Sequence, residues 1–130
     1  MKIEKMKWIT RDIVRANPDK LFLFGDNFKR AGYGGQAKEM RGEPNTFGIA
    51  VKFTPSRDEK AFFTEKGGHA GNCGQIDLEF NRLANTIRDG HYTTVVIPSD
   101  GIGTGLAELD KRAPKTFAYL QEKLAELESL

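Results

Sequence analysis

Residues 21–37 read LFLFGDNFKRAGYGGQA and place a compact apolar run directly before a glycine-rich stretch. The run Leu21–Phe24 has the length and bulk of a strand that is buried on both faces, as in a parallel sheet. Gly25 closes the run, and a loop leads from there into a helix-prone segment, residues 36–41. A buried strand, a glycine loop and a helix in this order predict an α/β fold.

The same alternation of strands and helices continues on both sides of this stretch. Strands are predicted at residues 3–9, 47–53 and 93–97, and helices at residues 10–17, 76–90 and 113–127. Glycines between residues 67 and 74 predict a flexible connection. We therefore predict one domain, residues 1–130, folded as a three-layer α/β/α sandwich around a mixed or mostly parallel sheet.

Composition narrows the class of protein. The net charge of +2, from 20 basic and 18 acidic residues, is too balanced to indicate a nucleic-acid interface. No apolar run approaches the ~18 residues that span a bilayer, and none follows the basic start, so neither a membrane partner nor a secretory signal is expected. The lone cysteine, Cys73, excludes an internal disulfide and fits a cytoplasmic protein. With only His69 and His91 beside it, no metal site is predicted, and no cofactor is expected.

A second glycine-rich stretch, PSDGIGTGL at residues 98–106, follows the β-branched strand at 93–97. We call residues 25–37 the first glycine loop and residues 98–106 the second glycine loop. Three alternating glycines cost conformational entropy, which is hard to justify in a simple connector. Each loop follows a predicted central strand, and ligands of such sheets sit at the carboxyl ends of the strands. Either loop alone could be structural, but the pair favours a cradle for phosphate or ribose.

The first glycine loop also leads into a predicted helix. Gly32, Gly34 and Gly35 lack a Cβ atom, so their main-chain N–H groups can approach a ligand closely. The partial positive charge at a helix N-terminus favours a phosphate at the same place. The glycine spacing fits neither the dinucleotide-binding fingerprint nor the Walker loop.

The order of these motifs resembles that of the macro domain, the ADP-ribose-binding module. Residues 11–14 resemble its Gly-Asp-Ile-Thr-like stretch, and residues 23–27 resemble its strand with a terminal asparagine. Residues 32–37 are similar to its helix-opening glycine loop. Residues 96–105 are similar to its Pro-Ser-Ile-Ser-Thr-Gly stretch, and the predicted helix at 113–127 would close the domain. The resemblance in order covers most of the chain.

Two departures from the macro-domain pattern are typical of a divergent relative. Gly25-Asp26-Asn27 stands where the family has an asparagine-rich tetrad, and Tyr33 interrupts its triple glycine. The chain is also shorter than most macro domains, which predicts that an outer strand is missing.

The resemblance implies roles for individual residues. Asp12 would accept a hydrogen bond from the adenine amino group, beside the Ile13 main chain. Asn27 would contact the distal ribose, the N–H groups of both loops would hold the diphosphate, and Ile102 would cover the ligand. The predicted ligand-binding residues are Asp12, Ile13, Gly25, Gly32, Tyr33, Gly34, Gly35, Gln36, Ser99, Gly101, Ile102, Gly103, Thr104 and Gly105.

These roles predict a protein that binds ADP-ribose, or a related nucleotide diphosphate, between the two loops. As an ADP-ribosyl glycohydrolase it would remove ADP-ribose from a modified target, or a group from an ADP-ribose derivative. The candidate catalytic residues are Asp26, Asn27 and Asp100. Asn27 would position the distal ribose, and Asp26 or Asp100 would orient the attacking water beside an oxocarbenium-like transition state. The alternative is a non-catalytic module that reads or sequesters an ADP-ribose-type ligand.

Plainer interpretations of the acidic and amide residues stay open. Asp12 could be a first-turn acid that stabilises a helix dipole. Asp26 and Asn27 could be turn formers, and Asp100 could cap a turn.

The basic residues have similar alternatives. Lys29 and Arg30 could clamp a phosphate or be solvated. Lys52 ends a predicted strand and could reach the site, but a solvated side chain is favoured. Cys73, without a partner at a motif spacing, is predicted to be incidental. A nucleic-acid interface at Lys29, Arg30, Lys38 and Arg41 is not favoured, given the near-neutral charge.

Overall fold

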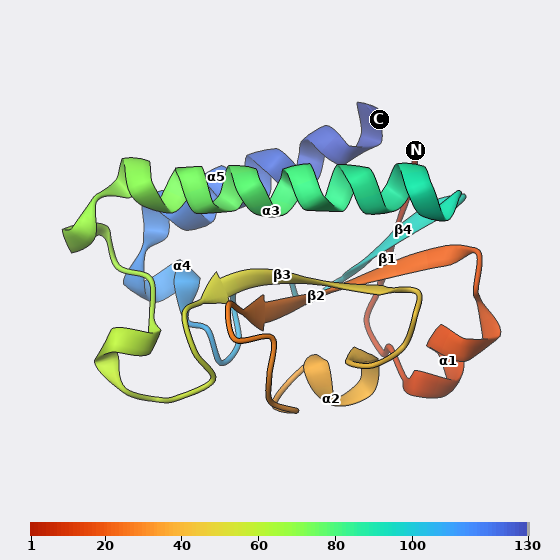
Figure 1. Ribbon diagram of the computed structural model, residues 1–130, viewed down its shortest axis with the longest axis horizontal. Helices are drawn as coiled ribbons and strands as arrows, with labels where there is room; N and C mark the ends of the chain where they lie inside the picture. Colours follow the sequence, from red (N-terminus) through yellow and green to blue (C-terminus); the bar gives the residue numbers. More distant parts are fainter. Residues whose placement is uncertain (130) are drawn as a thin grey trace.

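The computed structural model describes residues 1–129 (Figure 1). Within these residues the strands are β1 (Lys2–Met6), β2 (Lys20–Asn27), β3 (Thr46–Lys52) and β4 (Thr94–Pro98). The α-helices are α1 (Arg11–Ala16), α2 (Ala37–Met40), α3 (His69–Gly90), α4 (Leu109–Arg112) and α5 (Pro114–Glu126), and short 3-10 helices span Glu59–Ala61, Glu65–Gly67 and Leu127–Ser129. The strands form one sheet in the order β1-β4-β2-β3, and each neighbouring pair is parallel. The predicted α/β class and its mostly parallel sheet are confirmed.

Helices lie on both sides of this sheet. Figure 1 shows α3 and α5 along one face, while the short helices α1 and α2 lie on the other side. Leu21 and Leu23 of β2 belong to the core cluster that contains residues of α3 and α5. Phe22 and Phe24 belong to a second cluster with residues of α1 and α2. All of these β2 side chains are at most 3% exposed, so the prediction of a strand buried on both faces is confirmed.

β2 continues beyond its predicted end at Phe24 and includes residues 25–27. The neighbouring strand causes this extension, because residues 25–27 lie opposite residues 49–52 of β3 in the parallel ladder. The ladder becomes irregular between Asp26 and Asn27. Residues 25–27 of the first glycine loop are therefore the end of strand β2, as the resemblance to a strand with a terminal asparagine implies, and the irregular part of the loop begins at Phe28.

The glycines of residues 71–74 do not form the predicted flexible connection. They lie in α3, which starts at His69 and extends for 22 residues. Packing explains the difference, because Ile76, Phe80 and Leu83 bury one face of the helix and outweigh the low helix propensity of glycine. Neither α3 nor any other helix within residues 1–129 is long and apolar enough to cross a membrane.

Substitution of Gly74 by alanine is expected to stabilise the protein. Gly74 is exposed in α3, and a Cβ atom there would meet nothing within 4 Å. Alanine should therefore raise the free energy of unfolding by about 0.5–1 kcal/mol, as measured by urea denaturation. Gly68→Ala is the contrasting variant, because Gly68 has a φ of +112° and alanine there should destabilise. A loss of stability in Gly74→Ala would contradict a helix at this position.

Candidate functional site

The parallel sheet opens at the carboxyl ends of its two central strands. β2 pairs with β4 only over residues 20–22, opposite residues 94–96. Beyond that point β2 pairs with β3, and β4 pairs with β1. The gap between β2 and β4 is the place where a ligand is expected in an open parallel sheet.

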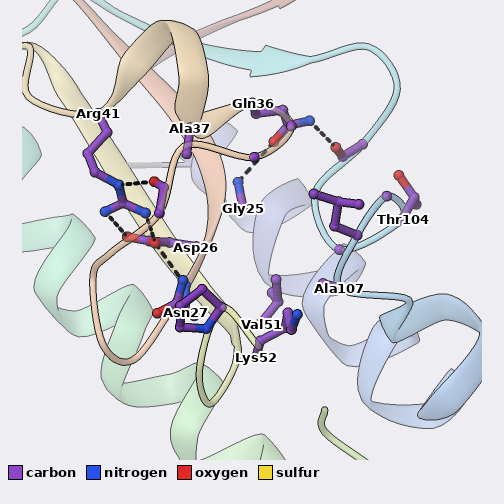
Figure 2. A pocket seen from close by; sticks show the side chains of 18 of the residues that line it. Gly25, Asp26, Asn27, Gln36, Ala37, Arg41, Val51, Lys52, Thr104 and Ala107 are labelled. Atoms are coloured by element: carbon purple, nitrogen blue, oxygen red, sulfur yellow. Dashed lines mark hydrogen bonds and ion pairs between the residues drawn. The ribbon is translucent and has the colours of Figure 1, made fainter. Parts of the chain in front are cut away.

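A cavity of about 310 Å³ occupies this gap (Figure 2). Both glycine loops line it, together with the carboxyl ends of β2 and β3. Loop segments that are more than 60 residues apart in the chain are thereby brought to one place. The predicted site residues in its wall are Gly25, Asp26, Asn27, Gly32, Gly34, Gly35, Gln36, Asp100, Gly101, Gly103, Thr104 and Gly105.

Five predicted ligand-binding residues lie outside the cavity wall. Asp12 is exposed on α1, and Ile13 packs against the second core cluster. Tyr33 is 67% exposed, and Ser99 is also exposed, with its N–H bonded to the Met6 carbonyl. Ile102 is fully buried in the main core. The expectation that the Ile102 side chain covers a ligand is therefore wrong, because the side chain points into the protein.

Gln36 joins the two glycine loops through its side-chain amide. Its Oε1 accepts the Gly25 N–H at 2.9 Å, and its Nε2 donates to the Gly101 carbonyl at 2.9 Å (Figure 2). These bonds use main-chain groups beside the gap where β2 and β4 no longer pair. The two loops are also close at a second place, because a Cβ atom added at Gly34 of the first loop would lie 2.8 Å from Leu106 Cδ1 of the second. Gln36 therefore bridges the sheet opening.

Asp26 forms a buried ion pair with Arg41. Both carboxylate oxygens accept from the Arg41 guanidinium, and Oδ1 also accepts the Asn27 N–H at 2.8 Å. Arg41 donates further to the carbonyls of Ala31 and Gly32, at 3.2 and 2.7 Å. The Asp26 carboxylate is thus occupied in holding the first glycine loop, and it does not suit the predicted role of orienting a water molecule.

Asn27 and Asp100 differ in how far they are already used. The Asn27 amide donates to the Ala31 carbonyl at 2.9 Å and accepts the Lys29 N–H at 3.0 Å, as expected of a turn former. Asp100 is exposed, and its carbonyl accepts the Thr104 hydroxyl at 2.7 Å. Within residues 1–129 the Asp100 carboxylate makes no hydrogen bond or ion pair. It is the acidic side chain of the cavity wall that is free to contact a ligand or a water molecule.

Lys52 was predicted to be solvated, and this prediction is wrong. Its side chain lines the cavity, the residue is only 7% exposed, and Nζ donates to the Ser56 carbonyl at 2.8 Å. The segment after β3 folds back over it, since Lys52 forms an antiparallel bridge with Phe62 and Nζ lies 4.4 Å from the Phe62 ring centre. Burial, and then the nearby charge of Arg57, lower the pKa of Lys52 below its usual 10.5.

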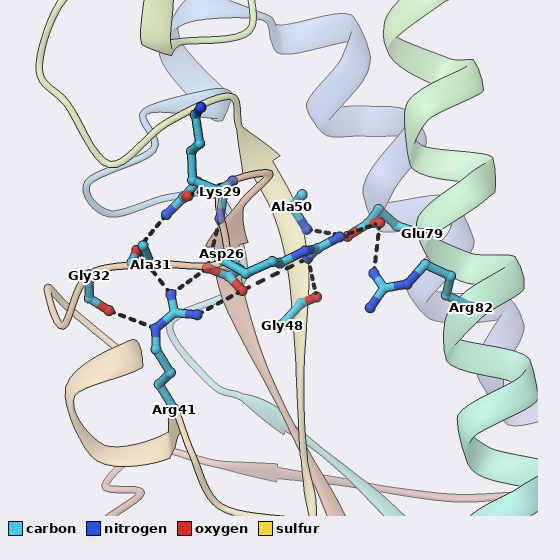
Figure 3. Close-up of polar contacts among 12 residues, drawn as sticks. Asp26, Lys29, Ala31, Gly32, Arg41, Gly48, Ala50, Glu79 and Arg82 are labelled. Atoms are coloured by element: carbon cyan, nitrogen blue, oxygen red, sulfur yellow. Dashed lines mark hydrogen bonds and ion pairs between the residues drawn. The ribbon is translucent and has the colours of Figure 1, made fainter.

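A second buried carboxylate, Glu79 of α3, extends the ion-pair network (Figure 3). Glu79 is 2% exposed and accepts from Arg30, from Arg82 and from the Ala50 N–H. Burial raises the pKa of Glu79, but the hydrogen bonds from Arg30, Ala50 and Arg82 together bring it below the usual 4.5. Arg30 also donates to the Gly48 carbonyl at 2.9 Å. Arg30 is therefore neither a free phosphate clamp nor a solvated side chain.

This network covers the outer edge of the sheet. β3 is an edge strand, so its outward main-chain groups have no strand partner. The Ala50 N–H donates to Glu79, and the Gly48 carbonyl accepts from Arg30. Side chains therefore provide hydrogen-bond partners for these two main-chain groups of the edge strand.

Cys73 lies outside the cavity wall, on α3. Its Sγ is 3.5 Å from His69 Nε2, a partner one helical turn away that the sequence interpretation did not recognise. Burial, and then Asp77, raise the pKa of the Cys73 thiol above 9.0, which keeps it protonated at neutral pH. Low reactivity agrees with the prediction that Cys73 is incidental.

A family model described as "Family of unknown function (DUF7831)" matches residues 4–123. The chain belongs to this family. The match runs from within β1 to within α5 and includes both glycine loops and the whole cavity wall. No curated protein matches the chain, and no solved structure matches it.

In this member of the DUF7831 family, the cavity offers mainly main-chain hydrogen-bond donors. Within residues 1–129 no hydrogen bond uses the N–H groups of Gly34, Gly35 and Gln36 in the first glycine loop, nor those of Gly103 and Thr104 in the second. Their residues all line the cavity. The predicted contribution of a helix dipole is small, because α2 has only four residues. The unused N–H groups of the loops are therefore the main hydrogen-bond donors of the cavity wall.

Proposed function

We propose that the chain binds ADP-ribose, or a related nucleotide diphosphate, in the cavity between the two glycine loops. The observation that carries the proposal is the convergence of both loops, with unused N–H groups, at the carboxyl ends of β2 and β4. Unpaired N–H groups in a concave site suit the oxygens of a diphosphate. The buried Lys52 ammonium adds a positive charge to the same wall.

We also propose that the fold is a reduced, macro-domain-like three-layer sandwich. The order of motifs along the chain supports this, as do the helices on both sides of the parallel sheet (Figure 1). The side-chain cover of the β3 edge agrees with the loss of an outer strand.

For the chemistry, we propose hydrolysis of a linkage at the distal ribose, with Asp100 as the carboxylate that orients water. The water oxygen bonds to the anomeric carbon, its proton passes to Asp100, and the bond to the target breaks with its electron pair leaving on the target. Asp100 is favoured over Asp26 because the Asp26 oxygens are held by Arg41. The alternative is a non-catalytic module with the same cavity, which the free Asp100 carboxylate argues against.

Isothermal titration with ADP-ribose tests the binding proposal. Saturable one-to-one binding is expected, and Gly105→Asp should weaken it at least about tenfold, because a carboxylate beside the diphosphate is repelled. Gly105 lines the cavity, and a Cβ atom there meets nothing within 4 Å, so the change is electrostatic. Gly74→Asp on α3 is the matched control with the same charge change and should bind like the parent. Absence of any ADP-ribose binding would overturn the proposal.

Release of ADP-ribose from modified protein or nucleic acid tests the chemistry. Asp100→Asn should abolish release while it still binds ADP-ribose. If the parent binds ADP-ribose but releases none from either substrate, the non-catalytic alternative replaces the hydrolase.

A further inference from the structure

The planar polar side chains of the cavity wall, apart from the exposed Asp100, are already used inside the protein. Arg41 binds both oxygens of Asp26, Asn27 closes its own turn, and Gln36 spans the two loops. Amide, carboxylate and guanidinium groups are the ones that read the edge of a nucleobase, because they present donors and acceptors in a fixed pattern. In this cavity all of those groups except the Asp100 carboxylate bind to the protein itself.

The groups left for a ligand are mostly donors. They are the unused main-chain N–H groups of both glycine loops and the Lys52 ammonium, which donates one hydrogen bond within residues 1–129, to Ser56. The exposed Asp100 carboxylate is left as an acceptor beside them. A nucleobase edge mixes donors and acceptors, so it would leave some of these N–H groups unpaired. Phosphate and ribose oxygens accept hydrogen bonds and satisfy them. The donor pattern therefore selects the sugar–phosphate part of a nucleotide.

The place of Asp12 points the same way. The macro-domain resemblance assigns the adenine amino group to Asp12, yet that side chain is exposed on α1 and outside the cavity wall. The cavity itself, at about 310 Å³, is at the low end of the roughly 300–1,000 Å³ found for small-molecule sites. Its size suits a ribose with phosphates better than a complete dinucleotide-like ligand.

We infer that the site recognises the ribose and phosphates of its ligand and leaves the base unread outside the cavity. The ligand class is then nucleoside diphosphate ribose of any base, an inference that rests on the proposed function. A base outside the cavity contributes stacking or solvent contacts that do not distinguish purines from one another.

Titration of the full chain with ADP-ribose, inosine diphosphate ribose and guanosine diphosphate ribose tests the inference. The inosine compound replaces the adenine amino group by a carbonyl, which would cost about tenfold or more if a protein acceptor read that group. We expect the three dissociation constants to agree within about threefold, since no base-reading hydrogen bond is made or lost. Adenosine, which lacks phosphates, should not bind measurably.

Asp12→Ala supplies a second measurement. Asp12 is exposed on the surface, so this variant should fold, and its affinity for ADP-ribose should stay within about threefold of the parent. If ADP-ribose binds but either base analogue, or Asp12→Ala, is more than about threefold weaker, the base is read and the inference fails while the proposed function stands. If ADP-ribose itself does not bind, the proposed function fails and the inference falls with it.

Discussion

Replacement of Glu79 by alanine is expected to lower the free energy of unfolding by about 1–3 kcal/mol. The variant leaves the Arg30 guanidinium without its main partner and leaves the Ala50 N–H of the edge strand unsatisfied. The Arg30 and Arg82 side chains are 33% and 52% exposed and keep part of their solvation, so the loss comes mainly from the removed hydrogen bonds and the buried Ala50 N–H. Urea denaturation at neutral pH measures the loss.

Glu128→Ala is the control for this prediction. Glu128 is exposed at the end of the chain, so its replacement should change stability by no more than about 0.5 kcal/mol. A loss below about 1 kcal/mol in Glu79→Ala would contradict the buried network.

The same carboxylate predicts a loss of stability in acid. The folded-state pKa of Glu79 lies below the usual 4.5, so its stabilisation is fully present above that value. As the pH falls through the folded pKa, Glu79 takes up a proton and the stabilisation is lost. The stability difference between the parent and Glu79→Gln should therefore be largest at neutral pH and shrink below about pH 4. A constant difference across this range would contradict the ionised state of Glu79.

Gly48→Ala is expected to damage both stability and the binding cavity. A Cβ atom at Gly48 would lie 2.8 Å from Asp26 Cβ and 2.9 Å from Asp26 Cγ, and closer still to Oδ2. Both residues sit in paired strands, so neither backbone can move away cheaply. We expect a loss of about 1–3 kcal/mol in the free energy of unfolding, as for other overpacked interiors.

The second effect of Gly48→Ala concerns the ligand. Displacement of Asp26 shifts Arg41, and Arg41 holds the Ala31 and Gly32 carbonyls of the first glycine loop. ADP-ribose affinity should fall at least about tenfold in titrations below the unfolding transition. Gly71→Ala adds the same methyl group where nothing lies within 4 Å and is the control for both measurements. Parent-like stability and affinity in Gly48→Ala would show that Asp26 does not pack against residue 48.

The sequence alone was enough for the parallel sheet and for the convergence of the two glycine loops at one cavity. Leu21–Phe24 alternates between two buried faces, and a rule about strand ends placed both glycine loops at one edge of the sheet. These features depend on local pattern and on general properties of parallel sheets. The shared cavity of the two loops follows from them.

Other features depend on contacts between residues far apart in the chain. The extension of β2 to Asn27 needs its β3 partner, and the burial of Lys52 needs the segment that returns at Phe62. The pairing of Asp26 with Arg41 joins a strand to the far end of α2. Sequence pattern alone predicted a flexible connection at residues 71–74, because glycine disfavours a helix. The packing of α3 against the core overrides this local preference.

The Gln36 bridge has a consequence for the rate and cost of binding. Glycine-rich loops normally lose conformational entropy when a ligand orders them, and that loss weakens affinity. Gln36 joins Gly25 to Gly101 through hydrogen bonds within the protein, so part of the ordering takes place during folding. The two loops then behave as one preorganised wall. For the ligand proposed above, this order before binding means that association should be limited by diffusion and desolvation more than by loop closure.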